Sequence, residues 1–204
     1  DASKRFLDAL KTQREDDHRF YHHSRINQSL HLVSAVCFLL GYGLLFTDPA
    51  AAALVGWLGA MLSRQIGHFF FEPKTYDFVN QASHEHKEAI KVGYNLRRKI
   101  VLMLVWALSP VVLMFDPTLF GWIEAPQEMP DYVQRTGEIW LFVGAGGLLV
   151  RMVQLCALKD AMTALVWAAK IVTDPLHDIK LYYKSPLYVL RGELIDPMAS
   201  SKGG

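Results

Sequence analysis

The chain has 204 residues and a formal net charge of +1, and 51% of its residues are apolar while 20% are charged. This length fits one domain or one small membrane bundle, and the near-zero charge says little about partners. The two cysteines, Cys37 and Cys156, lie inside apolar blocks without metal-ligand spacing, which argues against a disulfide framework. The sequence contains no Gly-rich phosphate loop, nucleophile elbow or nucleic-acid motif, so no nucleic-acid partner is predicted.

Residues 1–28 are highly charged and form a predicted cytoplasmic N-terminal segment, and long apolar blocks follow them. Because a bilayer core needs ~20 mostly apolar residues per helix, we predict about four transmembrane helices within residues 29–158. A soluble all-α protein is the alternative, but core helices normally keep a polar face, which these blocks lack. The predicted spans lie near residues 29–47, 50–72, 99–116 and 138–158.

Residues 159–198 are predicted to form an interfacial or cytoplasmic C-terminal region. Residues 160–173 are too short for a span and fit a helix that leaves the membrane or lies at its interface, and Asp174–Pro175 is expected to end it. The tyrosines and lysines that follow suit the lipid headgroup layer. The predicted fold is therefore an all-α integral membrane helical bundle, a single membrane domain over residues 1–198 with a flexible tail at 199–204.

Lysine and arginine alternate between the predicted loops as the positive-inside rule requires. They are frequent in 1–28, in 73–98 and after residue 158, whereas 47–50 has none and 116–138 has only Arg135. We therefore place both termini on the cytoplasmic side of an integral membrane protein. The membrane is the inner membrane if the protein is bacterial and the endoplasmic reticulum if it is eukaryotic.

All eight histidines fall on or near this cytoplasmic side, and the outer loops contain none. Histidines at membrane depth usually mark a pathway, a ligand or a metal. Their concentration on one face predicts a single polyhistidine site. The eight are His18, His22, His23, His31, His68, His84, His86 and His177.

Two sets of polar residues repeat at every fourth position at the cytoplasmic ends of the first two spans. Each four-residue step advances only ~40° beyond a full helical turn, so each set lies on one helix stripe. Two antiparallel helices can face such stripes toward each other. Two or three histidines with open positions, at most one carboxylate and no thiolate suit non-haem Fe(II). The sets are His23, Asn27 and His31 on one helix and Arg64, His68 and Glu72 on the next.

Other members of the histidine group have plainer interpretations. His22 by itself fits a surface position, and His84 and His86 fit a solvated helix start with Ser83 as its N-cap. His177 follows the last apolar segment, where a surface anchor is the plainer interpretation and where it could also dip into the site. We therefore keep His84, His86 and His177 as additional ligands whose participation the sequence leaves open.

Two short boxes carry a resemblance to a known family. "FYHHSRINQSLH" at 20–31 has a Tyr-His-His, then an Asn, then a His eight residues after the second His, and "QIGHFFFEP" at 65–73 has a Gly-His-x-x-Phe-Glu box. Both resemble the membrane protein family of the yeast 2-hydroxy fatty acid dioxygenase, which acts in phytosphingosine breakdown. The region after residue 80 departs from that family's pattern. The matching residues are Tyr21, His22, His23, Asn27, His31, Gly67, His68 and Glu72.

The resemblance implies Fe(II)-dependent oxidation that shortens a 2-hydroxy fatty acid by one carbon, with O₂ as co-substrate. The fatty acyl chain would lie among the helices, as expected for a membrane lipid substrate, and Arg64 is expected to pair with the substrate carboxylate. Glu72 or His22 would complete the iron shell or hydrogen-bond a ligand. The predicted metal ligands are His22, His23, His31 and His68, and the predicted catalytic residues are Asn27 and Glu72, which the resemblance includes, and Arg64, which comes from the four-residue spacing on the second helix.

The residues leave other classes open. A membrane haem protein would use His31 and His68 as axial ligands of haem b, as an electron carrier or a non-catalytic subunit of a larger membrane complex. An assembly protein would hold structural metal or none, and a zinc hydrolase would also use a three-histidine site. Association with a membrane protein partner or as a homo-oligomer is equally open.

Overall fold

The computed structural model describes residues 2–198, so the predicted tail at 199–204 lies outside the described residues. Within that range the fold is all-helical, as predicted, and contains isolated bridges but no strand. The elements are α1 (Ala2–Tyr21), α2 (Arg25–Leu44), α3 (Pro49–Leu54), η1 (Val55–Met61), α4 (Leu62–Ile66), η2 (Gly67–Phe71), α5 (His84–Ile90), α6 (Leu96–Phe115), α7 (Met129–Leu158), α8 (Ala161–Tyr182) and α9 (Ser185–Leu190).

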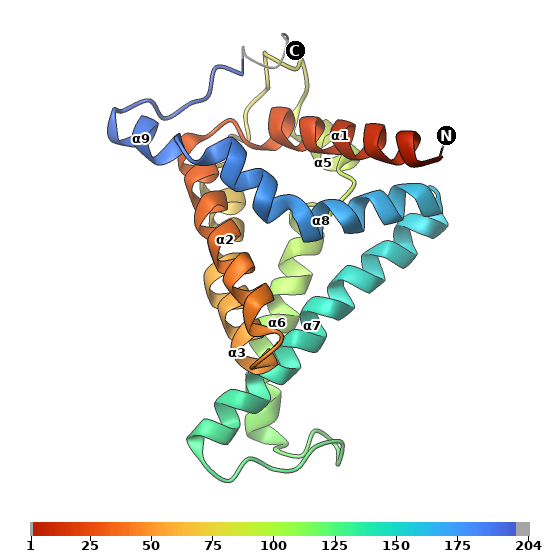
Figure 1. Cartoon of the computed structure of the whole chain (residues 1–204), viewed down its shortest axis with the longest axis vertical. Helices are drawn as coiled ribbons and strands as arrows, with labels where there is room; N and C mark the ends of the chain where they lie inside the picture. Colours follow the sequence, from red (N-terminus) through yellow and green to blue (C-terminus); the bar gives the residue numbers. More distant parts are fainter. Residues whose placement is uncertain (1, 199–204) are drawn as a thin grey trace.

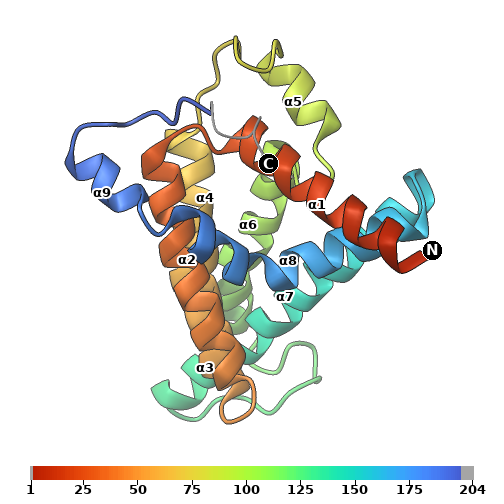
Figure 2. The same ribbon diagram turned by 45° about the horizontal axis from the view of Figure 1, so that its top comes forward.

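The helices form an upright bundle capped at one end by helices that lie across it (Figure 1). Helices α1 and α8 make this cap, and α5 and α9 lie at the same end (Figure 2). Helix α2 packs against the α3–η2 run, and α7 packs against α3, α6 and α8. The segments that carry histidines therefore gather at the capped end, while the connection between α6 and α7 lies at the opposite end.

Side-chain caps explain where several helices begin. Ser24, Asp48, Asn95 and Asp160 each accept a hydrogen bond from a backbone N–H in the first turn of the following helix. Such caps satisfy amide donors that the helix itself leaves unpaired. The cap at Ser24 matters most for function, because it separates α1 from α2 and leaves the residues just before it outside both helices.

Two helices, α6 and α7, are long and apolar enough to cross a membrane. Only 11% of the apolar window of each is buried inside the protein, so most of their apolar side chains face outward rather than into a core. This exposure is what lipid-facing helices require. Polar residues interrupt the apolar pattern of α2, and π-helical turns divide the α3–η2 run into short segments.

The expected end of a helix at Asp174–Pro175 is wrong, because α8 continues through both residues to Tyr182. Pro175 removes one helical hydrogen bond, but it is fully buried and its neighbours hold the helix in place. Asp174 accepts a hydrogen bond from Lys170 at 2.5 Å and lies 3.3 Å from the Arg14 guanidinium. Tertiary contacts therefore override the local stop signal.

A buried ion cluster joins the two cap helices. The Lys170 ammonium of α8 lies 3.1 Å from the Asp17 carboxylate of α1, in addition to its bond with Asp174. Burial opposes ionisation of Asp17, yet the Lys170 charge prevails and the pKa of Asp17 is held well below its usual value. The cluster thus fixes the C-terminal part of α1 against α8, just ahead of the break at residues 22–24.

A close helix contact below the cap generates a stability prediction. A Cβ atom added at Gly137 of α7 would fall within 3.0 Å of three backbone atoms of Ala50 in α3, whereas one added at Gly146 would meet nothing within 4 Å. We predict that Gly137→Leu lowers the free energy of unfolding by about 1–3 kcal/mol through overpacking, and that Gly146→Leu changes it little. Thermal unfolding in detergent measures both, and equal stability of the two variants would contradict the α3–α7 contact.

Candidate metal centre

Three histidines from three different segments meet at the capped end of the bundle. His22 lies in the break between α1 and α2, His31 lies in the second turn of α2, and His68 lies in the π-helical turn η2. All three are buried, with 2%, 2% and 5% of their surface exposed. π-Helical turns inside helices occur frequently at functional sites, because they re-aim side chains that a regular helix would point elsewhere.

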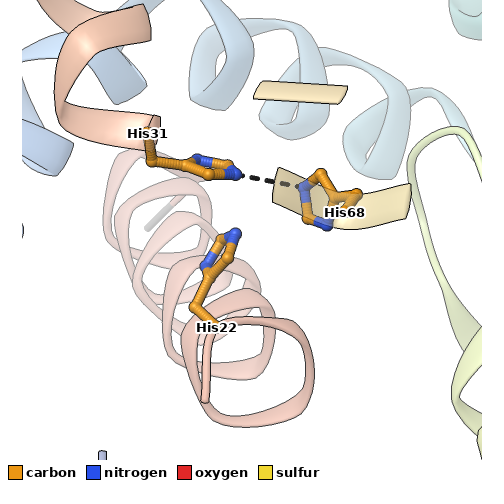
Figure 3. A group of neighbouring side chains, drawn as sticks. All are labelled: His22, His31 and His68. Atoms are coloured by element: carbon orange, nitrogen blue, oxygen red, sulfur yellow. Dashed lines mark hydrogen bonds between the residues drawn. The ribbon is translucent and has the colours of Figure 1, made fainter. Parts of the chain in front are cut away.

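The imidazole rings of His22, His31 and His68 point toward a common centre (Figure 3). One nitrogen from each lies within 4.8 Å of the other two. The Nε2 atoms of His31 and His68 are 3.2 Å apart. Two nitrogens bound to one ion at about 2.1 Å would lie about 3.0 Å apart at a right angle and about 3.4 Å apart at a tetrahedral angle. The observed spacing falls between these values.

A hydrogen bond between the two imidazoles is the alternative explanation for that short distance. It accounts for His31 and His68 but leaves the Nε2 atom of His22 buried without a partner among the described residues. A buried polar atom without a partner costs free energy. An ion at the centre of the three rings satisfies all three nitrogens at once.

The outward nitrogen of His68 is held by a carboxylate. Its Nδ1 lies 2.6 Å from Oε2 of Glu72, which is the first residue beyond η2. A histidine that binds metal commonly donates its other N–H to a carboxylate, which fixes the tautomer and the ring orientation. Glu72 therefore supports His68, and its second oxygen, Oε1, is buried and has no hydrogen-bond partner in the described part of the chain.

The outward nitrogen of His31 faces a second carboxylate. Its Nδ1 lies 3.6 Å from Oδ2 of Asp178 on α8, and the same oxygen accepts a hydrogen bond of 2.5 Å from the Arg64 guanidinium. Arg64 is thereby engaged with a protein carboxylate, whereas it was predicted to pair with the substrate carboxylate. In the structure Arg64 fixes Asp178, and Asp178 faces His31.

The outward nitrogen of His22 meets the hydroxyl of Tyr182. That hydroxyl lies 2.9 Å from Nδ1 of His22 and 3.0 Å from Nδ1 of His18. Both contacts are satisfied when His22 donates its Nδ1–H to the hydroxyl oxygen and the hydroxyl donates to His18. In this arrangement Nε2 of His22 carries a lone pair aimed at the centre.

Burial sets the protonation states of His22 and Tyr182. It holds the pKa of His22 well below its usual value, so the imidazole is neutral, which is the form that binds metal. Burial also raises the pKa of Tyr182 well above its usual value, so the hydroxyl keeps its proton and remains a donor. Both states are those that the hydrogen-bond chain requires.

His23 does not join the group, contrary to its expected place on the stripe with His31. The stripe assumed one helix through residues 23–31, but α2 begins only at Arg25, and the break sends the side chain of His23 the other way. Its Nε2 lies 2.5 Å from the carbonyl oxygen of Arg19 and 3.2 Å from a carboxylate oxygen of Asp77. The structure puts His22 in the position that His23 was expected to take.

Asn27 has a packing role rather than a place among the three rings. Its Nδ2 donates to the carbonyl oxygen of Tyr21 at 3.1 Å, across the break. A Cβ atom added at Gly67 would overlap with Oδ1 of Asn27. Glycine at position 67 therefore allows α2 and η2 to approach closely, and this contact brings His31 and His68 within reach of each other.

The three additional candidates lie outside the three-histidine group. His84 and His86 are in the first turn of α5 behind the N-cap Ser83, as their plainer interpretation expected, and His86 is exposed. His177 is half-buried on α8 and lines a small pocket together with His22 and Tyr182. None of the three contributes a nitrogen to the centre.

Sequence reasoning treated the tyrosines after residue 175 as headgroup anchors and missed the role of Tyr182. The signal was present in α8, because four polar residues there recur at every fourth position and so lie on one face. All four are buried. They are Lys170, Asp174, Asp178 and Tyr182.

The donor set favours a single small ion. Neutral imidazoles suit iron, zinc, copper and nickel. The ring centroid of His22 lies 4.2 Å from that of His31 and 5.3 Å from that of His68, so its ring occupies space that a porphyrin between the other two would need. Comparisons of the chain with family models, with curated proteins and with solved structures find no match.

We predict that the chain binds about one divalent ion, as a three-histidine centre does, and that His68→Ala abolishes this binding while His23→Ala retains it. The reason is that His68 supplies a nitrogen to the centre, whereas His23 does not. Co(II) titration of the metal-free protein, followed by absorption, measures both. Loss of binding in His23→Ala with retention in His68→Ala would contradict the grouping.

We further predict that Tyr182→Phe lowers the metal affinity about 10- to 100-fold, because the hydroxyl orients His22. Tyr183→Phe is the matched control, since Tyr183 is 59% exposed. Both variants keep the aromatic ring, so their thermal stability should stay close to that of the wild type. Equal affinities for the two variants would show that the hydroxyl does not support the centre.

Proposed function

We propose that the protein is an Fe(II)-dependent membrane dioxygenase that shortens a 2-hydroxy fatty acid by one carbon. The observation that carries this proposal is the convergence of three buried imidazole nitrogens from His22, His31 and His68. Each ring also has an oxygen near its outward nitrogen. The resemblance of the two histidine boxes to the 2-hydroxy fatty acid dioxygenase family adds the substrate class.

The three histidines would hold the iron and leave other coordination positions open. An Fe(II) ion bound there would supply the affinity for O₂ and for the carboxylate and hydroxyl of a 2-hydroxy acid, together with one-electron chemistry. Zinc fits the same nitrogens but offers no redox step. The orphaned Nε2 of His22 is the atom that an ion would satisfy.

The reaction balances without a further reductant. R–CH(OH)–COOH and O₂ give R–COOH, CO₂ and H₂O. Cleavage of the bond between the first two carbons releases four electrons, which is the number that reduces O₂ to the oxidation level of water. The reaction therefore needs neither a 2-oxo acid nor an electron-transfer partner. This agrees with a centre whose histidines are surrounded by carboxylates and a tyrosine.

The chain's own residues would orient the ligands and exclude water. Glu72 keeps the ring of His68 in the tautomer whose Nε2 faces the centre, and the carboxylate of Asp178 lies 3.6 Å from Nδ1 of His31. The half-buried Arg64 pairs with Asp178 and so offsets the cost of burying that carboxylate. A cavity of about 500 Å³ begins at His31 and His68 and continues between largely apolar walls, where an acyl chain would lie.

The membrane placement follows from the same arrangement. Helices α6 and α7 would be joined as spans by α2 and by the α3–η2 run, which pack alongside them. The capped end would lie at the cytoplasmic face, because the lysines and arginines of the N-terminal segment and of residues 73–98 gather there. The metal centre would then meet fatty acids at the depth of the lipid carboxylates.

We predict that the iron-loaded protein consumes O₂ when given 2-hydroxyhexadecanoic acid and forms one CO₂ for each O₂, and that hexadecanoic acid gives no uptake. The 2-hydroxyl is needed because its carbon is the one oxidised. His68→Ala should lose at least 100-fold in rate, while His86→Ala, an exposed residue on α5, should keep it. Oxygen-electrode and ¹⁴CO₂ measurements give both quantities. Uptake that persists in His68→Ala would contradict the proposed centre.

A further inference from the structure

The cavity beside the metal centre has two lysines on its wall. Lys91 lies in the link between α5 and α6, and Lys99 lies in the first turn of α6. Both lysines line the same cavity as His31 and His68. Lys99 is 8% exposed, and the Nζ atom of Lys91 is fully buried.

Neither ammonium group has an anionic partner within ion-pair distance among residues 2–198. The Nζ atom of Lys91 has no hydrogen bond there and lies 3.8 Å from the ring centroid of Tyr21. Every other lysine, arginine or carboxylate on the cavity wall is already paired. These pairs are Asp16 with Arg19, Asp17 with Lys170, and Arg64 with Asp178.

Two carboxylates that lie outside the cavity wall, Glu72 and Glu88, form no ion pair with either lysine within residues 2–198; one oxygen of each is bonded elsewhere, and the other is buried without a hydrogen bond there. Glu72 is bonded to His68, and Glu88 accepts a hydrogen bond of 2.6 Å from the backbone N–H of Leu96. The cavity therefore presents two ammonium groups whose cost of burial is not offset within its wall. An anionic group of a ligand would offset it.

The rest of the wall is apolar. Phe38, Trp57, Leu102, Trp140 and Leu148 line it away from the metal centre. A volume of about 500 Å³ is within the range of small-molecule sites. A cavity with cations at one end and apolar walls along the rest matches a single-chain amphiphile with an anionic head.

We infer that Lys91 and Lys99 bind the carboxylate of a fatty acid whose chain occupies this cavity. The inference deepens the proposed function, on which its choice of a carboxylate head rests, and it transfers to these lysines the role that the sequence assigned to Arg64. One carboxylate oxygen reaches the lysines while the other remains free to face the metal centre. Lys91 and Lys99 are thus positioning residues for the substrate head.

The test measures binding of tritiated hexadecanoic acid to the metal-free protein in detergent, because this ligand needs neither iron nor turnover. Lys99→Met and Lys91→Met should each weaken binding about 10- to 100-fold, the range for a hydrogen-bonded charge. Lys74→Met, at an exposed position, is the matched control and should bind as the wild type does. Hexadecanol should bind equally to all four proteins, because it has no charge to lose.

A cavity-blocking variant tests where the chain lies. Gly56 lines the cavity, and a Cβ atom added there meets nothing within 4 Å. Gly56→Phe should therefore abolish binding of both the acid and the alcohol while it preserves the thermal stability. Unchanged binding in this variant would overturn the assignment of the chain to the cavity.

The outcomes separate this inference from the proposed function. Acid binding that is equal in the wild type and both lysine variants overturns the inference, whatever the protein does with iron. If the acid binds in a lysine-dependent way but the iron-loaded protein consumes no oxygen, the inference stands and the proposed dioxygenase activity is wrong. If hexadecyl phosphate binds more than 100-fold more tightly than the acid, the two lysines recognise a phosphate head group, and the inference of a carboxylate is wrong. If the Lys99→Met variant also fails to bind hexadecanol, its cavity has collapsed. Binding of the acid to the Lys91→Met variant then tests the inference.

Discussion

Three imidazole nitrogens that face one another in a buried space form the constraint around which the capped end of the protein is built. Without an ion, the Nε2 atom of His22 has no hydrogen-bond partner within residues 2–198, and a buried polar atom in that state costs free energy. The surrounding groups nevertheless hold this geometry. A carboxylate, an arginine-bound carboxylate and a tyrosine hydroxyl lie near the three outward nitrogens. Hydrogen bonds to the outward nitrogens of His22 and His68 are the support that metal-binding histidines commonly have.

The helices around the centre serve that constraint in different ways. The break before Ser24 turns His22 inward, and the close approach of Gly67 to Asn27 sets the spacing between α2 and η2. Helix α8 crosses the end of the bundle and supplies both Asp178 and Tyr182 from one face. The ion cluster between α1 and α8 keeps this face in place. The metal centre is thus the point where four separate segments of the chain meet, which explains why it lies at the cap and not within the bundle.

Sequence patterns predicted part of this arrangement, and the remainder required tertiary contacts. The apolar blocks predicted the helices, and the spacing of polar residues singled out His31, His68 and Glu72, which the structure brings together. Both His22 and His23 were named as ligands, and the stripe that joined His23 to His31 assumed a continuous helix, although Ser24 before Arg25 is itself an N-cap signal. The continuation of α8 through Pro175 was not predictable from local rules, because buried ion pairs between distant segments decide it. The four-residue spacing of the polar residues on α8 was visible in the sequence. The histidines that Asp178 and Tyr182 face, His31 and His22, could be identified only from the fold.

The central claim is that the three histidines hold redox-active iron. The most direct measurement is the metal content and absorption spectrum of the wild-type protein purified anaerobically in detergent. The account predicts about one iron per chain, as a mononuclear non-haem site requires, and no Soret band. A Soret band would contradict it in favour of haem, and zinc in place of iron would contradict the dioxygenase. Absence of any metal after gentle purification and reconstitution with Fe(II) would show that the three imidazoles are not a metal centre.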